Sequence, residues 1–173
     1  LFRQEYPAEP EEAFLTTGRP VFNPDQLQQL LHDTEDVKTR LALEGEEWVK
    51  HNRGELTVYR EHDEGERYII GADTAMGITG GDYSVAQVLD SKKRQVAIWR
   101  GHVHPDYFAE ILYALGMFYN EAHIIVENNN HGLLTCTRLG KDFAYPNFYT
   151  EVQHDKITAR ETVKLGFSTT ART

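Results

Sequence analysis

The chain has 173 residues, a net charge of −9, 40% hydrophobic residues and 26% charged residues, which fits one globular domain with a sizeable core and an appended element. No apolar segment approaches the ~20 residues of a membrane-spanning helix, and the first residues lack the basic-then-apolar order of a secretory signal. The single cysteine, Cys136, excludes an internal disulfide and a cysteine zinc site, and suits a reducing cytosol.

The first third of the chain predicts little regular structure. Four prolines are spaced through residues 1–24, and a helix is expected from Pro24 to residues 32–35, with Asn23 as its N-cap. Residues 36–52 are highly charged, and their apolar residues settle on no single period. We therefore expect residues 1–54 to be an N-terminal arm or linker, and residues 55–173 to be the compact domain, which starts between residues 55 and 67.

From residue 55 onward the hydrophobic pattern predicts alternating strands and helices. Strands are expected at residues 56–60, 67–73, 83–90, 94–103, 122–126 and 147–152, and helices at 105–118 and 133–139. The order indicates an α/β fold, in which an antiparallel three-stranded meander and parallel strands form a mixed sheet flanked by helices.

Two acidic residues stand where apolar strands end. Asp73 follows an apolar run and precedes a loop with three glycines, and Glu127 follows a second run at residues 122–126. If the two strands are neighbours, both carboxylates lie at one edge of the sheet, where their like charges are costly unless a cation compensates them. Carboxylate oxygens are the ligands that Mg²⁺ and Mn²⁺ prefer. Asp82, after Gly80 and Gly81, can reach the same edge as a further acid.

Each of these side chains also has a structural explanation. An aspartate before or after glycines can bond the local backbone in a turn, which applies to Asp73 and Asp82. A loop histidine such as His131 can be a proton relay, a phosphate contact or only a helix cap or surface group. The basic cluster of Lys92, Lys93 and Arg94 gives candidate DNA contacts or a solvated hairpin turn.

Three segments in matching order resemble the large subunit of phage terminases. They are YPAEPEEAFLTTGRPVF at residues 6–22, IGADTAMGITGGDYS at residues 70–84 and IVENNNHG at residues 125–132. The first resembles the segment that leads from the packaging ATPase into the C-terminal nuclease domain, and the other two resemble that nuclease domain itself. The resemblance implies an RNase H-like fold and a divalent-metal endonuclease, with two Mg²⁺ or Mn²⁺ ions, that cuts concatemeric double-stranded DNA at packaging.

The same resemblance assigns roles to individual residues. Asp73 matches the first catalytic acid, Glu127 the second, and Asp82 an additional acid after the glycines. The family has a third acid on a late helix, and we expect it to lie beyond Thr173, so the chain by itself is expected to be inactive or only weakly active. The implied partners are DNA, the terminase ATPase domain, the small terminase subunit and the portal, in the cytoplasm of the host cell.

Two other functions fit parts of the sequence. An actin-like phosphotransferase shares the RNase H-like topology, but predicts a second phosphate-binding hairpin that residues 126–132 do not supply. A non-catalytic docking module for portal or small terminase subunit needs no intact metal site. No P-loop of the GxxxxGK[ST] type is present in the sequence.

Overall fold

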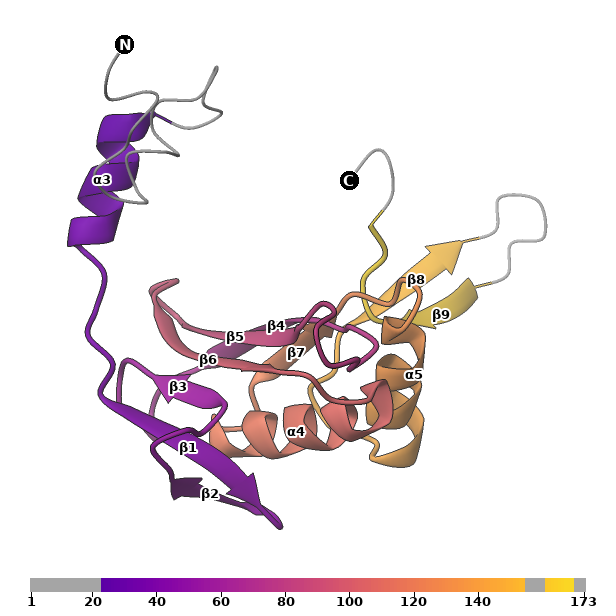
Figure 1. Ribbon diagram of the computed structural model, residues 1–173. Helices are drawn as coiled ribbons and strands as arrows, with labels where there is room; N and C mark the ends of the chain where they lie inside the picture. Colours follow the sequence, from indigo (N-terminus) through magenta and orange to yellow (C-terminus); the bar gives the residue numbers. More distant parts are fainter. Residues whose placement is uncertain (1–22, 155–160, 170–173) are drawn as a thin grey trace. The chain divides into compact units, whose positions relative to one another are not determined.

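The computed structural model describes residues 23–154 and 161–169, and the chain divides into two compact units, Leu1–Asp36 and Val37–Thr173 (Figure 1). In the first unit, helix α3 (Pro24–His32) begins where the sequence predicts. The Asn23 side chain accepts a hydrogen bond from the backbone N–H of Asp25 at 2.9 Å, which caps the helix. The first of the three terminase-like motifs, at residues 6–22, lies outside the described residues.

The second unit is built on a seven-stranded sheet with the order β2-β1-β3-β6-β5-β4-β7. Its strands are β1 (Thr39–Glu44), β2 (Glu47–Lys50), β3 (Leu56–Val58), β4 (Tyr68–Asp73), β5 (Ser84–Asp90), β6 (Gln95–Gly101) and β7 (His123–Val126). Strands β4, β5 and β6 form an antiparallel meander, and β7 pairs with β4 in parallel. The predicted α/β fold, with a meander and a parallel strand in one mixed sheet, is confirmed.

The hairpin of β1 and β2 differs from the expectation for residues 36–52. Its turn is made by Gly45 at φ +64°, a conformation that glycine adopts without steric cost. Leu43 and Trp48 face each other across the hairpin, and β1 also pairs with β3. The compact unit thus starts at Val37 rather than between residues 55 and 67. The hairpin escaped the sequence pattern because its strands are only partly buried and do not alternate cleanly.

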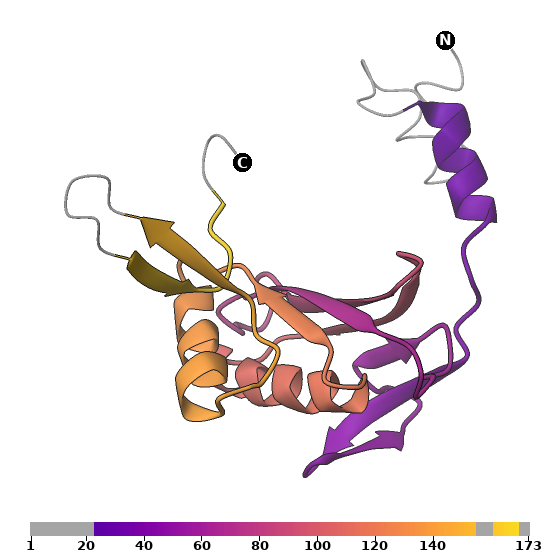
Figure 2. The same cartoon turned by 180° about the vertical axis from the view of Figure 1, so that it is seen from behind.

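One face of the sheet is covered by helix α4 (Pro105–Phe118), with α5 (Gly132–Thr137) and the π-helix η1 (Arg138–Asp142) beside it (Figures 1 and 2). The core consists of apolar side chains between α4 and the sheet. They include Ile70, Val88, Phe108, Leu112, Leu115, Ile124 and Val126. In β4 the residues alternate between this buried face and the opposite one, so Ile69, Gly71 and Asp73 lie on the face that no described element of this unit covers.

The outer edge of β7 is covered by two irregular segments. Phe148 and Phe167 bridge to Ile124 and Glu127 in parallel, and they lead into and out of a separate two-stranded sheet of β8 (Thr150–His154) and β9 (Glu161–Leu165). This covering leaves no free edge on β7 among the described residues. None of the described helices has the length and apolar character needed to cross a membrane.

Candidate metal and nuclease site

A pocket of about 570 Å³ lies at the end of β4 and β7. Its lining includes the three acids that the sequence placed at this edge, Asp73, Asp82 and Glu127, together with the loop residue His131. The other lining residues come from the loop after β4 and the loop after β7. The structure therefore brings together side chains that are far apart in the chain, although their chemical roles remain a prediction.

The pairing of β4 with β7 explains why Asp73 and Glu127 meet. Ala72 is paired with Val126 in parallel register, and the next residue of each strand is an acid. The backbone N–H of Glu127 donates to the carbonyl oxygen of Ala72 at 3.0 Å. Ala72 and Val126 are buried, Asp73 is exposed and Glu127 is half-buried, so both carboxylates lie on the open face of the sheet.

The loop between β4 and β5 carries Asp82 to the same pocket. The buried Ser84 hydroxyl accepts a hydrogen bond from the backbone N–H of Ala75 at 3.0 Å and closes the base of the loop. Gly77 has φ +77°, and any side chain there would overlap the backbone of Val103. Glycine is thus required at residue 77 both for its backbone conformation and for its close approach to the segment before α4.

The loop after β7 holds Glu127 in place. The side-chain amide of Asn129 donates to Glu127 Oε1 at 2.7 Å. Asn128 is buried and donates to the carbonyl oxygen of Leu165 at 2.7 Å, which fastens the loop to the end of β9. His131 is the N-cap residue of α5, but its side chain makes no capping hydrogen bond and it is exposed at the pocket.

The donor set suits a hard divalent cation. Within the described residues, no lysine or arginine forms an ion pair with Asp73, Asp82 or Glu127, and the pocket is lined by neither residue type. The described residues contain no group of three Asp, Glu, His or Cys side chains close enough to hold one ion together. An ion bound here would therefore use one or two carboxylates, with waters or substrate oxygens as its other ligands, which is a common arrangement for Mg²⁺.

The predicted basic cluster lies at the opposite end of the meander. Lys92 and Lys93 occupy the turn between β5 and β6, about 20 Å along the strand from the pocket end of β5. The Arg94 guanidinium is bound to Asp90, with Nε and NH2 each 2.7 Å from Oδ2. The structure thus gives Arg94 a role in closing this turn. DNA contacts by the cluster stay a prediction.

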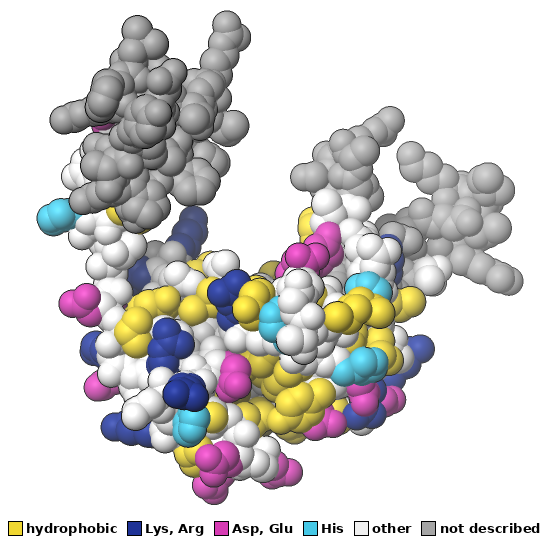
Figure 3. All heavy atoms as spheres, in the orientation of Figure 1, with side chains coloured by type: hydrophobic (Ala, Val, Ile, Leu, Met, Phe, Trp, Pro, Cys, Tyr) yellow, Lys and Arg dark blue, Asp and Glu magenta, His cyan; other side chains and the backbone are white. Residues whose placement is uncertain are grey.

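The sequence interpretation missed three residues beside the pocket: Tyr83, Arg100 and His102. The Arg100 guanidinium carbon lies 3.6 Å from the centre of the Tyr83 ring, and the His102 ring lies 3.8 Å from the same ring, centre to centre. Only the pairing register of β5 and β6 could have revealed this cluster, because its members lie on different strands and loops. On the visible face of the molecule, basic side chains lie among acidic ones (Figure 3). The net negative charge of the chain therefore does not exclude local contacts between its basic side chains and an anion.

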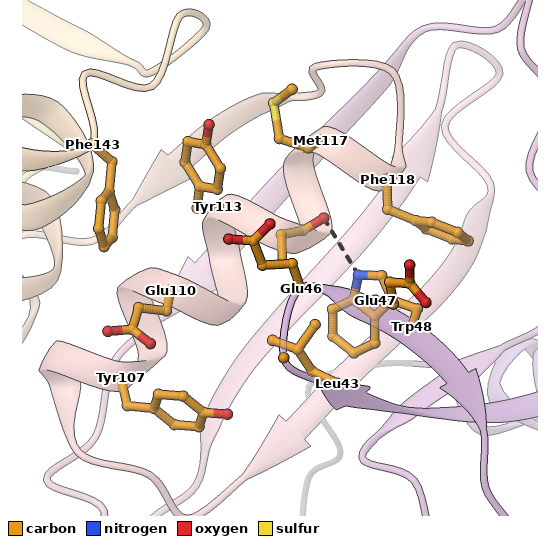
Figure 4. Close-up of a pocket in the computed structure, with 12 residues that line it drawn as sticks. Leu43, Glu46, Glu47, Trp48, Tyr107, Glu110, Tyr113, Met117, Phe118 and Phe143 are labelled. Atoms are coloured by element: carbon orange, nitrogen blue, oxygen red, sulfur yellow. Dashed lines mark hydrogen bonds between the residues drawn. The ribbon is translucent and has the colours of Figure 1, made fainter.

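A larger groove of about 830 Å³ lies between the β1–β2 hairpin and α4 (Figure 4). Trp48 forms one wall, and its Nε1–H donates to the carbonyl oxygen of Ala114 at 3.4 Å. Tyr107, Tyr113 and Met117 of α4 line the other wall. The groove is lined by aromatic and apolar side chains together with Glu46, Glu47 and Glu110. It contains neither of the strand-end acids, so we place the metal chemistry in the smaller pocket.

No protein-family model and no curated protein sequence matches the chain. Among solved structures, it is similar to the large terminase nuclease from thermophilic phage G20c with bound magnesium, at 22% identity and a TM-score of 0.48 over 57% of this chain and 51% of that one. For the same nuclease with bound zinc, the identity is 24% and the TM-score 0.47, over 55% of this chain and 54% of that one.

The nuclease domain of the large terminase from Thermus phage P74-26 is also similar, at 23% identity and a TM-score of 0.44 over 55% of this chain and 47% of that one. The matched part therefore spans about half the length of these structures. The proteins in these structures are large terminase nucleases, the class of protein that the sequence motifs resemble.

Proposed function

We propose that the chain is the nuclease part of a terminase large subunit, which cuts concatemeric double-stranded DNA by metal-dependent phosphodiester hydrolysis. The observation that carries this proposal is the meeting of Asp73 and Glu127 at the ends of two adjacent parallel strands. The motifs at residues 70–84 and 125–132 support it, because their acids are the ones that line the pocket. DNA, the packaging ATPase, the small subunit and the portal are the proposed partners, and the host cytoplasm is the proposed location.

Five residues of the pocket have a proposed role in the reaction. Asp73 and Glu127 hold the metal, and Asp82 is a further acid on the loop at the edge of the same pocket. When bound, one or two Mg²⁺ or Mn²⁺ ions supply an activated water and stabilise the leaving oxygen. Asn129 fixes the orientation of Glu127 through its hydrogen bond to Oε1. His131 is exposed at the pocket, where its imidazole would act as a proton relay or a phosphate contact.

Cleavage of supercoiled plasmid DNA by the terminase large subunit that carries this nuclease part tests the proposal. We expect nicked and linear products in Mg²⁺ or Mn²⁺, no products in EDTA, and a loss of at least about a hundredfold in rate for Asp73→Ala and for Glu127→Ala. Glu64→Ala is a matched control, because Glu64 is exposed in the turn before β4, at the other end of that strand. Its cleavage rate should equal that of the wild type.

The same experiment separates the alternatives. Metal-dependent cleavage that survives both Asp73→Ala and Glu127→Ala would contradict the assignment. Transfer of phosphate from ATP, without DNA cleavage, would instead favour the actin-like phosphotransferase. If the protein bound portal or small terminase subunit but lacked both activities, a docking role would be favoured.

A further inference from the structure

Four residues form a row across the open face of the sheet. Asp73 of β4 is paired directly with Val85 of β5, and Val85 is paired with Arg100 of β6. Glu127 extends the row on the other side, one residue beyond the pairing of Ala72 with Val126. Directly paired residues point to the same face of a sheet, so the Arg100 side chain emerges on the face that carries both acids.

The spacing of the row sets the distance between its charges. Two strand spacings separate Asp73 from Arg100, which is about 10 Å between their Cα atoms. Val85 stands between them and offers no charge of its own. Arg100 forms no ion pair with any described residue, so its charge is not neutralised by the acids of the pocket.

Arg100 is held by an aromatic ring that belongs to the pocket. Tyr83 lines the pocket together with the acids, and this residue is 40% exposed. The Arg100 guanidinium lies over the Tyr83 ring, 3.6 Å from its centre, a cation–π arrangement that orients the side chain without occupying its N–H donors. The other neighbour of Tyr83 is His102, whose Nδ1 donates to the carbonyl oxygen of Asp82 at 3.2 Å. Arg100 is therefore pre-positioned beside the loop that carries Asp82.

We propose that Arg100, oriented by the Tyr83 ring, binds a DNA phosphate next to the one that is cleaved and thereby positions the strand over Asp73 and Glu127. This inference rests on the proposed nuclease function. A polyanion that approaches a pocket lined with acids needs a nearby cation, and guanidinium groups bind phosphate with two parallel N–H donors. Arg100 meets both needs on the correct face. It acts as a positioning residue, since the metal site would carry the chemistry.

Binding of a fluorescein-labelled DNA duplex, measured by anisotropy without divalent metal, tests the inference apart from cleavage. We expect Arg100→Ala to raise Kd about tenfold at low salt, the typical effect of losing one charge-assisted hydrogen bond. The slope of log K against log salt should become shallower by about one, the value expected for one lost phosphate contact. Arg100→Lys should restore most of the salt slope, because the positive charge remains.

Arg67→Ala is the matched control. Arg67 is an exposed arginine directly before β4, about 20 Å from Asp73 along the strand, and its loss should leave Kd within about twofold of the wild type. Equal weakening by Arg67→Ala and Arg100→Ala would show a diffuse charge effect and overturn the inference. An unchanged Kd and salt slope for folded Arg100→Ala would overturn it as well.

The two proposals fail in different ways. If the wild-type large subunit does not cleave DNA in any divalent metal, the nuclease proposal fails, while the anisotropy titration still decides whether Arg100 binds DNA. If the wild type cleaves and Arg100→Ala binds and cleaves equally well, only the role of Arg100 is wrong. Inorganic phosphate, added as a competitor, distinguishes a free-anion site from a DNA contact: displacement of the duplex at low millimolar phosphate from the wild type but not from Arg100→Ala would overturn the DNA assignment.

Discussion

Asp73 follows Ala72 and Glu127 follows Val126, and Ala72 and Val126 are paired between the parallel strands β4 and β7. The pairing fixes both carboxylates at one end of the sheet and on one face. Two like charges in such a place repel each other, and a bound cation removes that cost. A divalent metal ion should therefore stabilise the folded protein, and this stabilisation should be lost when either acid is removed.

The first prediction concerns Asp73→Asn, which keeps the size of the side chain and removes its charge. In EDTA the variant should unfold at the same temperature as the wild type or slightly higher, because one repulsion is lost. At a Mn²⁺ concentration about a hundred times Kd, the wild type should gain about 2.7 kcal/mol, or roughly 5–10 °C in Tm for a chain of this size. Differential scanning fluorimetry measures both shifts.

Glu64→Gln is the control for this measurement, because it removes one exposed carboxylate at the other end of β4. It should keep the full Mn²⁺ shift. If Asp73→Asn retained the same shift as the wild type, Asp73 would not be a metal ligand.

A second prediction concerns Gly132, the first residue of α5. A Cβ atom at this position would overlap the carbonyl oxygen of Glu127, so Gly132→Ala must move the end of β7 or the start of α5. We expect a loss of about 2 kcal/mol in the free energy of unfolding, as for other overpacked sites, and slower metal-dependent cleavage because Glu127 is displaced. Urea unfolding followed by circular dichroism measures the stability.

Gly71→Ala is the matched control for Gly132→Ala. Gly71 lies on the open face of β4, where an added Cβ atom would have no neighbour within 4 Å and the backbone φ is an ordinary one, so alanine should be tolerated there. Equal destabilisation by both substitutions would mean that the close approach of Gly132 to Glu127 is unimportant.

The sequence predicts the centre of this fold better than its margins. Strands β4, β5, β6 and β7 and helix α4 could be placed because each has a clear apolar period. The convergence of Asp73 and Glu127 could be predicted because each acid ends such a run. Arg100 could not be placed beside them, because its position depends on the register of β5 and β6, which no single-strand pattern contains.

The third prediction concerns Asp90, which closes the turn between β5 and β6. This residue is only 4% exposed, and its carboxylate accepts hydrogen bonds from the backbone N–H groups of Lys92 and Arg94 at 2.9 Å, as well as from the Arg94 side chain. Removing this buried acceptor leaves the backbone N–H groups of Lys92 and Arg94 without their partner, so Asp90→Ala should cost about 3 kcal/mol in the free energy of unfolding. Chemical unfolding at pH 7 measures this cost.

The same carboxylate should make stability depend on pH. Burial acts to raise the pKa of Asp90, but the hydrogen bonds and the positive charge of Arg94 outweigh it and hold the pKa below its usual range. Since the folded protein binds this proton less readily than the unfolded chain, the stabilisation is present above the usual aspartate pKa of about 4. It is lost as the pH falls through the lower pKa of the folded state.

Unfolding curves between pH 7 and pH 2 check this dependence. Asp90→Ala should flatten the fall in stability below about pH 4, whereas Glu64→Ala should reproduce the wild-type profile. If both variants followed the wild-type profile, the Asp90–Arg94 pair would not contribute to acid sensitivity.

The last prediction concerns the thiol of Cys136 in α5, which is completely buried against the carbonyl oxygen of Val126. Burial raises the pKa of this thiol to about 12, so almost none of it is thiolate at pH 8, and the thiolate is the reactive form. Ellman's reagent should therefore leave the folded protein unmodified over minutes and react with one thiol per chain after guanidinium is added. Leu133→Cys is the positive control, because Leu133 lies on the same helix and is 58% exposed. Its new thiol should react without denaturant, and equally fast labelling of the wild type would show that α5 does not pack against β7 as described.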